Sequence, residues 1–223
     1  MKIGIGITTY KRDDLLKVCL EKIAEHTKSE HILYVAKDSD EDRRGIALRK
    51  NECLFHLQDC DYIFLFDDDC YPIKDGWETF FIEASKHTNY HHFNYLTSKT
   101  HLEKNFYFHG DWTIQSYHKC GGVFLFLTKE VLKKVGGLYD KYDLYGFEHL
   151  GYTLRIMMSG LIPEMYLCPS GADEYLFAHD YEMDNFPSTL CQDVKEKMNE
   201  KNKFVLEKDC ELIYREIIWE RKS

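Results

Sequence analysis

The chain has 223 residues, of which 44% are hydrophobic and 30% are charged. This composition is typical of a folded globular protein and excludes extensive disorder, which goes with a lower apolar content. The 29 lysines and arginines are outnumbered by 38 aspartates and glutamates, which gives a formal net charge of −9. This acidic balance argues against general nucleic-acid binding.

Targeting signals and the cysteine content indicate the cellular compartment in which the protein works. No run of the sequence approaches the ~20 apolar residues that a transmembrane helix requires. The first residues lack the longer apolar stretch of a signal peptide. The eight cysteines are expected to be free thiols rather than a disulfide framework. We therefore expect a protein of a reducing, cytoplasmic compartment without a membrane span, and the sequence indicates no oligomeric state.

The first half of the chain alternates short apolar strands with helices. Strands are predicted over 3–7, 32–36 and 62–66, with one helix beginning at Asp13 and another over 46–57. This alternation predicts parallel strands joined by crossover helices, a Rossmann-like arrangement. Ligands of such sheets bind beyond the carboxyl ends of the strands. Three polar segments lie at those ends and should converge on one crevice, namely 8–12, 37–44 and 67–69.

The second half is less regular in its pattern. Helices are predicted over 76–87, 129–135 and 146–159, and strands over 92–96, 106–108, 123–127 and 163–167. From residue 189 onward we expect mainly helix, with an amphipathic face that carries residues such as Val205 and Trp219 and packs onto the rest of the chain. No Pro- or Ser-rich linker divides these parts, so we predict a single domain.

The three consecutive carboxylates Asp67, Asp68 and Asp69 follow the apolar strand over 62–66. Adjacent carboxylates repel one another unless a cation neutralises them. Oxygen ligands suit Mg²⁺ or Mn²⁺, which can also bind diphosphate oxygens. A solvated acidic turn is the plainer interpretation of the triplet alone. The buried strand before it and Pro72 after it favour a metal site.

An ordered set of motifs resembles the glycosyltransferases of the GT-A fold, and among them the broad family 2 type. Residues 7–12 are similar to the family's segment of Thr, Tyr, Asn and Arg, residues 37–39 to its Asp-Gly-Ser turn, and residues 67–69 to its DxD motif. The segments 121–122 and 135–140 resemble its acceptor side. Residues 145–149, followed by Arg155, resemble the helix start Trp-Gly-x-Glu-Asp and its later Arg. The resemblance covers roughly residues 1 to 180.

The resemblance implies an α/β protein with a GT-A (Rossmann-like) single domain, whose mixed, mainly parallel central sheet is flanked by helices. Residues 1–96 would form a nucleotide-sugar-binding half, 97–180 an acceptor-side half, and 181–223 a C-terminal helical extension. The implied activity is metal-dependent transfer of a sugar from a nucleotide-diphosphate sugar to a hydroxyl group of a glycan or other acceptor. A UDP-sugar is the expected donor and inversion the expected outcome.

The implied site residues fall into three groups. Donor binding is expected from Thr8, Thr9, Tyr10, Arg12, Asp38, Arg44, Lys50, Asp67 and Asp68, with Asp38 matching the residue that commonly contacts the base. Mn²⁺ or Mg²⁺ is expected on Asp67, Asp69 and His179. The base that deprotonates the acceptor is expected to be Glu148, and His149 is the second candidate, because it stands where the family has an Asp and an imidazole titrates near neutrality.

Two alternatives stay open. A nucleotidyltransferase shares a similar half-fold, but it needs a glycine-rich loop after the first strand, whereas Gly4 and Gly6 lie within that strand. A catalytically inactive, sugar- or nucleotide-binding relative would account for the missing Asp at position 149. Turnover of a nucleotide-sugar would discriminate between this relative and an enzyme.

Overall fold

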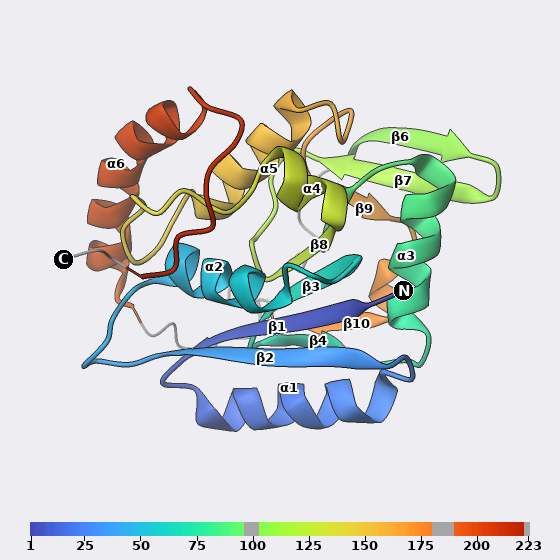
Figure 1. Ribbon diagram of the computed structural model, residues 1–223, viewed down its shortest axis with the longest axis horizontal. Coiled ribbons are helices and arrows are strands. Elements are labelled where there is room, and N and C mark those ends of the chain that lie inside the picture. Colours follow the sequence, from blue (N-terminus) through green and yellow to red (C-terminus); the bar gives the residue numbers. More distant parts are fainter. Residues whose placement is uncertain (96–102, 180–189, 221–223) are drawn as a thin grey trace.

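The computed structural model describes residues 1–95, 103–179 and 190–220, and a five-stranded sheet in the order β2-β1-β3-β8-β5 forms its centre (Figure 1). The strands are β1 (Ile3–Tyr10), β2 (His31–Asp38), β3 (Tyr62–Asp67), β5 (His92–Asn94) and β8 (Phe124–Thr128). β1 pairs in parallel with both β2 and β3, while β8 is antiparallel to its neighbours β3 and β5. The expected mixed, mainly parallel sheet is therefore confirmed.

Helices flank this sheet, with α1 on one face and α2 on the other (Figure 1). In chain order the helices are α1 (Asp13–His26), α2 (Ile46–Leu57), α3 (Trp77–Thr88), α4 (Lys129–Lys134), α5 (Glu148–Met158) and α6 (Gln192–Asp209). None of the helices in the described ranges is long and apolar enough to cross a membrane.

Two smaller sheets complete the described structure. One pairs β4 (Cys70–Pro72) with β10 (Leu176–Ala178), and the other has the order β6-β7-β9. Its strands are β6 (Glu103–His109), β7 (Trp112–Tyr117) and β9 (Leu167–Pro169), and a short 3₁₀ helix spans Ala172–Glu174. β4 begins directly after the acidic triplet, so the small β4–β10 sheet fixes the direction in which the chain leaves that triplet.

The core is rich in aromatic rings because β3 and β8 are buried on both faces and read as continuous apolar runs. The Trp77 ring of α3 packs against Phe64 and Phe66 of β3, at centroid distances of 4.7 and 5.4 Å. Other fully buried rings of the same cluster are Phe81, Phe93, Phe124 and Phe126. This cluster holds β3 rigidly, so the residues at its carboxyl end have fixed positions.

Two expectations from the sequence are wrong. The strand predicted over 163–167 begins only at Leu167. The predicted C-terminal helix ends at Asp209, and residues 210–220, the C-terminal strap, run without helix back toward α2 (Figure 1). Backbone bonds to the body of the molecule replace the helical ones there, since Arg215 N donates to Val135 O at 2.9 Å and Gly137 N donates to Arg215 O at 3.0 Å.

Candidate functional site

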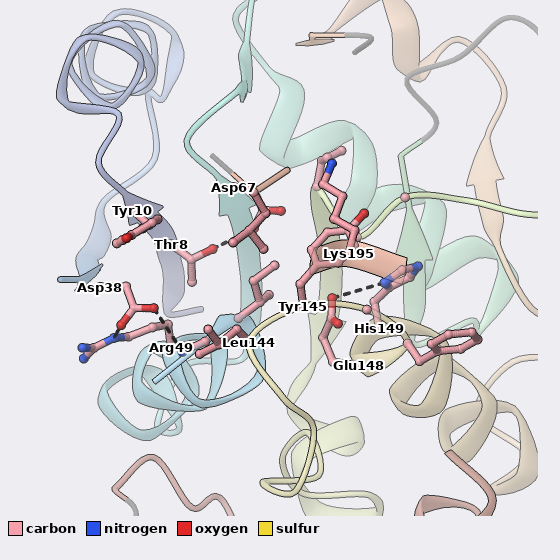
Figure 2. Close-up of a pocket in the computed structure, with 18 of the residues that line it drawn as sticks. Thr8, Tyr10, Asp38, Arg49, Asp67, Leu144, Tyr145, Glu148, His149 and Lys195 are labelled. Atoms are coloured by element: carbon pink, nitrogen blue, oxygen red, sulfur yellow. Dashed lines mark hydrogen bonds and ion pairs between the residues drawn. The ribbon is translucent and has the colours of Figure 1, made fainter. Parts of the chain in front are cut away.

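The three polar segments at the strand ends converge on one cleft of about 680 Å³ (Figure 2). The loop before α5 and the first turns of α6 complete its wall. Most of the predicted site residues line it, namely Thr8, Thr9, Tyr10, Arg12, Asp38, Asp67, Asp69, Glu148, His149 and His179. In Figure 2, Tyr10 and Asp38 lie at one end of the cleft, Thr8 and Asp67 lie in the middle, and Glu148 and His149 lie at the other end.

The acidic triplet is held by neighbouring hydroxyls and cations. Asp67 Oδ1 accepts a hydrogen bond from Thr8 Oγ1 at 2.7 Å and lies 3.0 Å from Lys50 Nζ. Asp68 accepts a hydrogen bond from the Thr9 hydroxyl at 2.6 Å and forms an ion pair with Arg12. The same guanidinium lies 2.8 Å from Asp69 Oδ2. The end of β1 and the residues directly after it thus supply both the hydroxyls and the arginine that hold the three carboxylates at the end of β3.

The nearby positive charges nevertheless do not fully offset the negative charge of this triplet. Burial raises the pKa of Asp68 to about 7, although Arg12 and the Thr9 hydrogen bond act in the opposite direction. Burial and the charge of Asp67 likewise raise the pKa of Asp69. Since raised carboxyl pKa values mean that the charged forms are disfavoured, an additional cation would be stabilised here.

The side chains present fit a divalent cation that shares its ligands with a substrate. Asp69 Oδ1 is buried and has no hydrogen-bond partner in the described part of the chain, and such an unsatisfied oxygen is costly. Asp67, Asp69 and His179 line the same cleft, and the His179 N–H donates to Asp69 O at 3.1 Å. Residues 1–95, 103–179 and 190–220 contain no group of three side chains arranged to hold a metal by themselves. Mg²⁺ is commonly bound by one or two carboxylates together with substrate phosphates.

Asp38 is engaged on both carboxylate oxygens. Its Oδ1 accepts from Arg44 N at 2.8 Å and Arg49 Nε at 3.1 Å, and its Oδ2 accepts from Gly45 N at 3.0 Å. Arg43 Nη1 lies 3.1 Å from Oδ2. A carboxylate offers about four lone-pair sites, so Asp38 anchors the start of α2. Its contact with a base stays a prediction.

Three predicted donor-binding residues do not line the cleft, namely Asp68, which is fully buried, Lys50 and Arg44. Lys50 is fully buried behind Asp67 and also donates to the Gly122 carbonyl. Arg44 turns toward the C-terminal strap, where its Nη1 donates to Trp219 O at 3.1 Å and its guanidinium lies 5.5 Å from the Trp219 ring. Lys50 therefore acts on the site through Asp67, and Arg44 faces the strap.

Three cations of the cleft were not among the predicted site residues. The Arg43 guanidinium lies over the Tyr10 ring, 3.2 Å from its centroid, and Arg49 lies beside Asp38. Lys195 comes from α6. Both Arg43 and Arg44 were expected on the ligand side of the sheet, but the sequence gives no means of telling which of the two adjacent arginines faces the cleft. No apolar periodicity in the sequence indicates the face of α6 on which Lys195 lies.

Glu148 and His149 form a hydrogen-bonded pair at the start of α5. His149 Nε2 lies 2.9 Å from Cys120 O, and Nδ1 lies 3.4 Å from Glu148 Oε1. Because a carbonyl oxygen only accepts, Nε2 carries a hydrogen and donates it to Cys120 O, while Nδ1 faces the Glu148 carboxylate. Burial alone would raise the pKa of Glu148, but His149, its own backbone N–H and Lys50 together hold that pKa below its ordinary value.

The backbone around this pair is strained and closely packed. Gly146 and Phe147 have φ values of 100° and 69°, and the left-handed conformation is unfavourable for a phenylalanine. A Cβ added at Gly122 would lie 3.0 Å from two ring atoms of His149. A strained turn on one side and a glycine on the other thus fix the side chains at 148 and 149.

No model of a known protein family matches the chain. An uncharacterized glycosyltransferase of Acanthamoeba polyphaga mimivirus is 22% identical over 241 aligned residues, which cover 92% of this chain and 93% of the relative.

Solved structures resemble the chain at low sequence identity. The Drosophila β1,4-galactosyltransferase 7, in complex with manganese, UDP-Gal and xylobiose, gives a TM-score of 0.56 at 18% identity and covers 88% of this chain and 79% of its own. Staphylococcus aureus TarS in complex with UDP gives 0.57 at 12% identity, covering 92% and 72%. The mannosyltransferase PcManGT of Pyrobaculum calidifontis, in complex with GDP-Man and Mn²⁺, gives 0.53 at 13%, covering 71% and 52%.

These likenesses agree with one another on the fold. The chain has the GT-A fold, and the resemblance to GT-A glycosyltransferases seen in its motifs is confirmed. The similarity supports an enzyme of glycosyl transfer.

Proposed function

We propose that the chain transfers a sugar from a nucleotide-diphosphate sugar, with a UDP-sugar as the expected donor, to a hydroxyl of a glycan or other acceptor. One observation carries the proposal: in a GT-A fold, Asp67 and Asp69 of the acidic triplet and Glu148 at the start of α5 line the same cleft. The manganese, UDP-Gal and xylobiose in the Drosophila structure support donor and acceptor classes of this kind.

The donor would lie along the carboxyl ends of the strands. Tyr10, Arg43 and Asp38 offer an aromatic ring, a planar cation and a carboxylate for the base end. The diphosphate would then lie near Arg12 and Asp69. A divalent cation held by Asp67, Asp69 and His179 would offset negative charge on the diphosphate oxygens. We expect this cation to be Mn²⁺ or Mg²⁺, and the manganese in the solved structures of the Drosophila galactosyltransferase and PcManGT favours Mn²⁺.

Glu148 is the proposed general base. The acceptor hydroxyl oxygen attacks the anomeric carbon, the bond from that carbon to the diphosphate oxygen breaks, and the hydroxyl proton passes to the Glu148 carboxylate. Attack opposite the leaving group inverts the anomeric configuration. His149 is the poorer base, because Nε2 bonds the Cys120 carbonyl and Nδ1 faces Glu148. Its proposed role is to keep Glu148 ionised and in place.

The decisive experiment measures nucleotide binding and its dependence on metal. We expect UDP or GDP to bind the purified protein in calorimetry, more tightly with MnCl₂ than with EDTA. Asp69→Asn should remove the gain from Mn²⁺, whereas Asp59→Asn, an exposed aspartate away from the cleft, should keep it. If neither nucleotide binds the protein in the presence of Mn²⁺, the proposal is wrong. If a nucleotide does bind, hydrolysis of a UDP-sugar would separate an enzyme from an inactive binding relative.

A further inference from the structure

α6 docks onto the molecule through a stripe of polar residues spaced seven apart. Seven residues make about two helical turns, so Lys195, Asn202 and Asp209 lie on one face of the helix. Asp209 is buried, 2.8 Å from Arg155 Nε and 3.0 Å from the Tyr142 hydroxyl. An apolar stripe would slide with little loss, but the ion pair with Arg155 and the hydrogen bond from Tyr142 fix the position of the helix.

The middle of the stripe fixes the helix to the loop before Glu148. Asn202 is fully buried, and its Nδ2 donates to Tyr145 O at 2.8 Å and to Gly146 O at 2.9 Å. Its Oδ1 accepts from Asp143 N at 3.0 Å. Both the N–H groups and the oxygen of the Asn202 amide thus form hydrogen bonds with the loop over residues 143–146. The position of α6 relative to the cleft is therefore set by the same loop that leads to the proposed base.

Lys195 stands at the cleft end of this stripe. It lines the cleft, and its Nζ lies 5.3 Å from the centroid of the Tyr145 ring (Figure 2). Lys201 on the same helix forms an ion pair with Asp143 at 2.8 Å, and Lys195 has no such partner among the carboxylates of the described residues. A half-buried ammonium without a counter-ion is costly, and an anionic ligand would remove that cost.

A second cation of the cleft acts on the same ammonium. Burial lowers the pKa of Lys195, and the positive charge of Arg12 lowers it further. The two cations come from opposite ends of the sequence, one after β1 and the other on α6. Like charges brought together in one cleft are stabilised by an anion that contacts both, and phosphate oxygens are strong acceptors from both groups.

We propose that Lys195 binds the diphosphate of the donor, opposite Arg12, and so adds α6 to the donor site. This inference rests on the proposed function. When the bond between the anomeric carbon and the diphosphate oxygen breaks, its electron pair stays on that oxygen, and the ammonium stabilises the added negative charge without giving up a proton.

The test compares ligands with and without phosphates. Calorimetry with UDP, GDP, uridine and guanosine, in the presence of MnCl₂, is run on the unmodified chain and on Lys195→Met, which keeps the apolar stem and removes the charge. Lys197→Met is the matched control, since Lys197 is exposed on the same helix and does not line the cleft. Lys195→Arg, which retains a cation, should recover part of the affinity.

We expect Lys195→Met to weaken binding of the nucleoside diphosphate by about 10- to 100-fold, the worth of one charge-assisted hydrogen bond. Nucleoside affinity should stay unchanged and the thermal midpoint should not fall, since Met removes the cost of the half-buried charge, and Lys197→Met should behave as the unmodified chain. Equal diphosphate affinity in Lys195→Met and the unmodified chain overturns this inference and leaves the proposed function intact. Equal losses for diphosphate and nucleoside also overturn it, because the lysine would then serve only packing. If the unmodified chain binds neither UDP nor GDP, the proposed function itself fails.

Discussion

Arg155 offers the sharpest test of how the second half of the molecule is held together. Its side chain has no exposed surface. The guanidinium donates to Val135 O and Ile213 O at 3.0 Å and to Gly137 O at 2.6 Å, and it lies 2.8 Å from Asp209 Oδ1. One side chain therefore connects α5, the loop after α4, α6 and the C-terminal strap. Arg155→Met keeps the apolar stem and removes every one of these contacts.

The expected loss is large because a buried charge is left behind. Removing one partner of a buried ion pair costs about 3–5 kcal/mol. For a chain of this length each kcal/mol corresponds to about 2–4 °C in the thermal midpoint. We therefore expect the midpoint of Arg155→Met to fall by about 6–20 °C. Breaking the exposed pair of Lys133 and Glu130 with Lys133→Met should cost no more than about 1 kcal/mol.

The pH dependence of this loss has a definite sign. Burial raises the pKa of Asp209, while Arg155 and the Tyr142 hydroxyl oppose that rise. Without Arg155 the pKa of Asp209 rises further, so the folded variant binds a proton more tightly than its unfolded chain does. Such a group favours folding at acid pH, and its contribution is lost as the pH rises from the unfolded carboxyl pKa through the raised folded one. The difference between the unmodified chain and Arg155→Met should thus be smallest at acid pH and grow toward neutrality.

Urea unfolding at several pH values, followed by circular dichroism, measures these free energies. The double variant Arg155→Met, Asp209→Leu should recover part of the loss, because no buried charge remains without a partner. A loss below about 1 kcal/mol in Arg155→Met, or a double variant less stable than the single one at neutral pH, would refute the reasoning.

Three further predictions concern the proposed base and its neighbour His149. Glu148→Gln should lower the rate of sugar transfer by about 10²–10⁴-fold and leave the affinity for the donor unchanged. His149→Gln should move the acid limb of the pH–rate profile to higher pH, because the ring that lowers the pKa of Glu148 is gone. If the acid limb does not move, His149 does not have this role. Gly122→Ala should slow transfer by about tenfold or more by displacing the His149 ring, whereas Gly121→Ala, whose Cβ would meet nothing closer than 3.9 Å, should transfer at the normal rate.

The parts of the fold that follow local rules could be predicted from the sequence. α2 has the predicted bounds, and β1, β2 and β3 are one to three residues longer than the apolar runs that indicate them. The ends of parallel strands meet at one edge of a sheet, so the convergence of residues 8–12, 37–44 and 67–69 also followed from pattern alone. β4 and β10 have three residues each, which is too short to show a period, and they were not predicted.

The contribution of α6 to the site could not be predicted, because its docking face is polar. Apolar periodicity is the signal by which a packed helix face is recognised, and Lys195, Asn202 and Asp209 carry none. Their meaning comes from partners far away in the sequence, such as the carbonyls of Tyr145 and Gly146 for Asn202. Similarly, only the three-dimensional arrangement shows that Arg43 stacks on Tyr10 while its neighbour Arg44 faces the strap.

The C-terminal strap has a consequence for the order in which the molecule can assemble during synthesis. Asn51 of α2 donates to Ile218 O across 167 positions of the chain, and Arg44 donates to Trp219 O across 175. Contacts this far apart close the largest loops and form late. While the ribosome still holds residues 190–220, the sheet and its acidic triplet can already be folded, but the wall formed by α6 cannot. A nascent chain would therefore expose the cleft until translation has passed the strap.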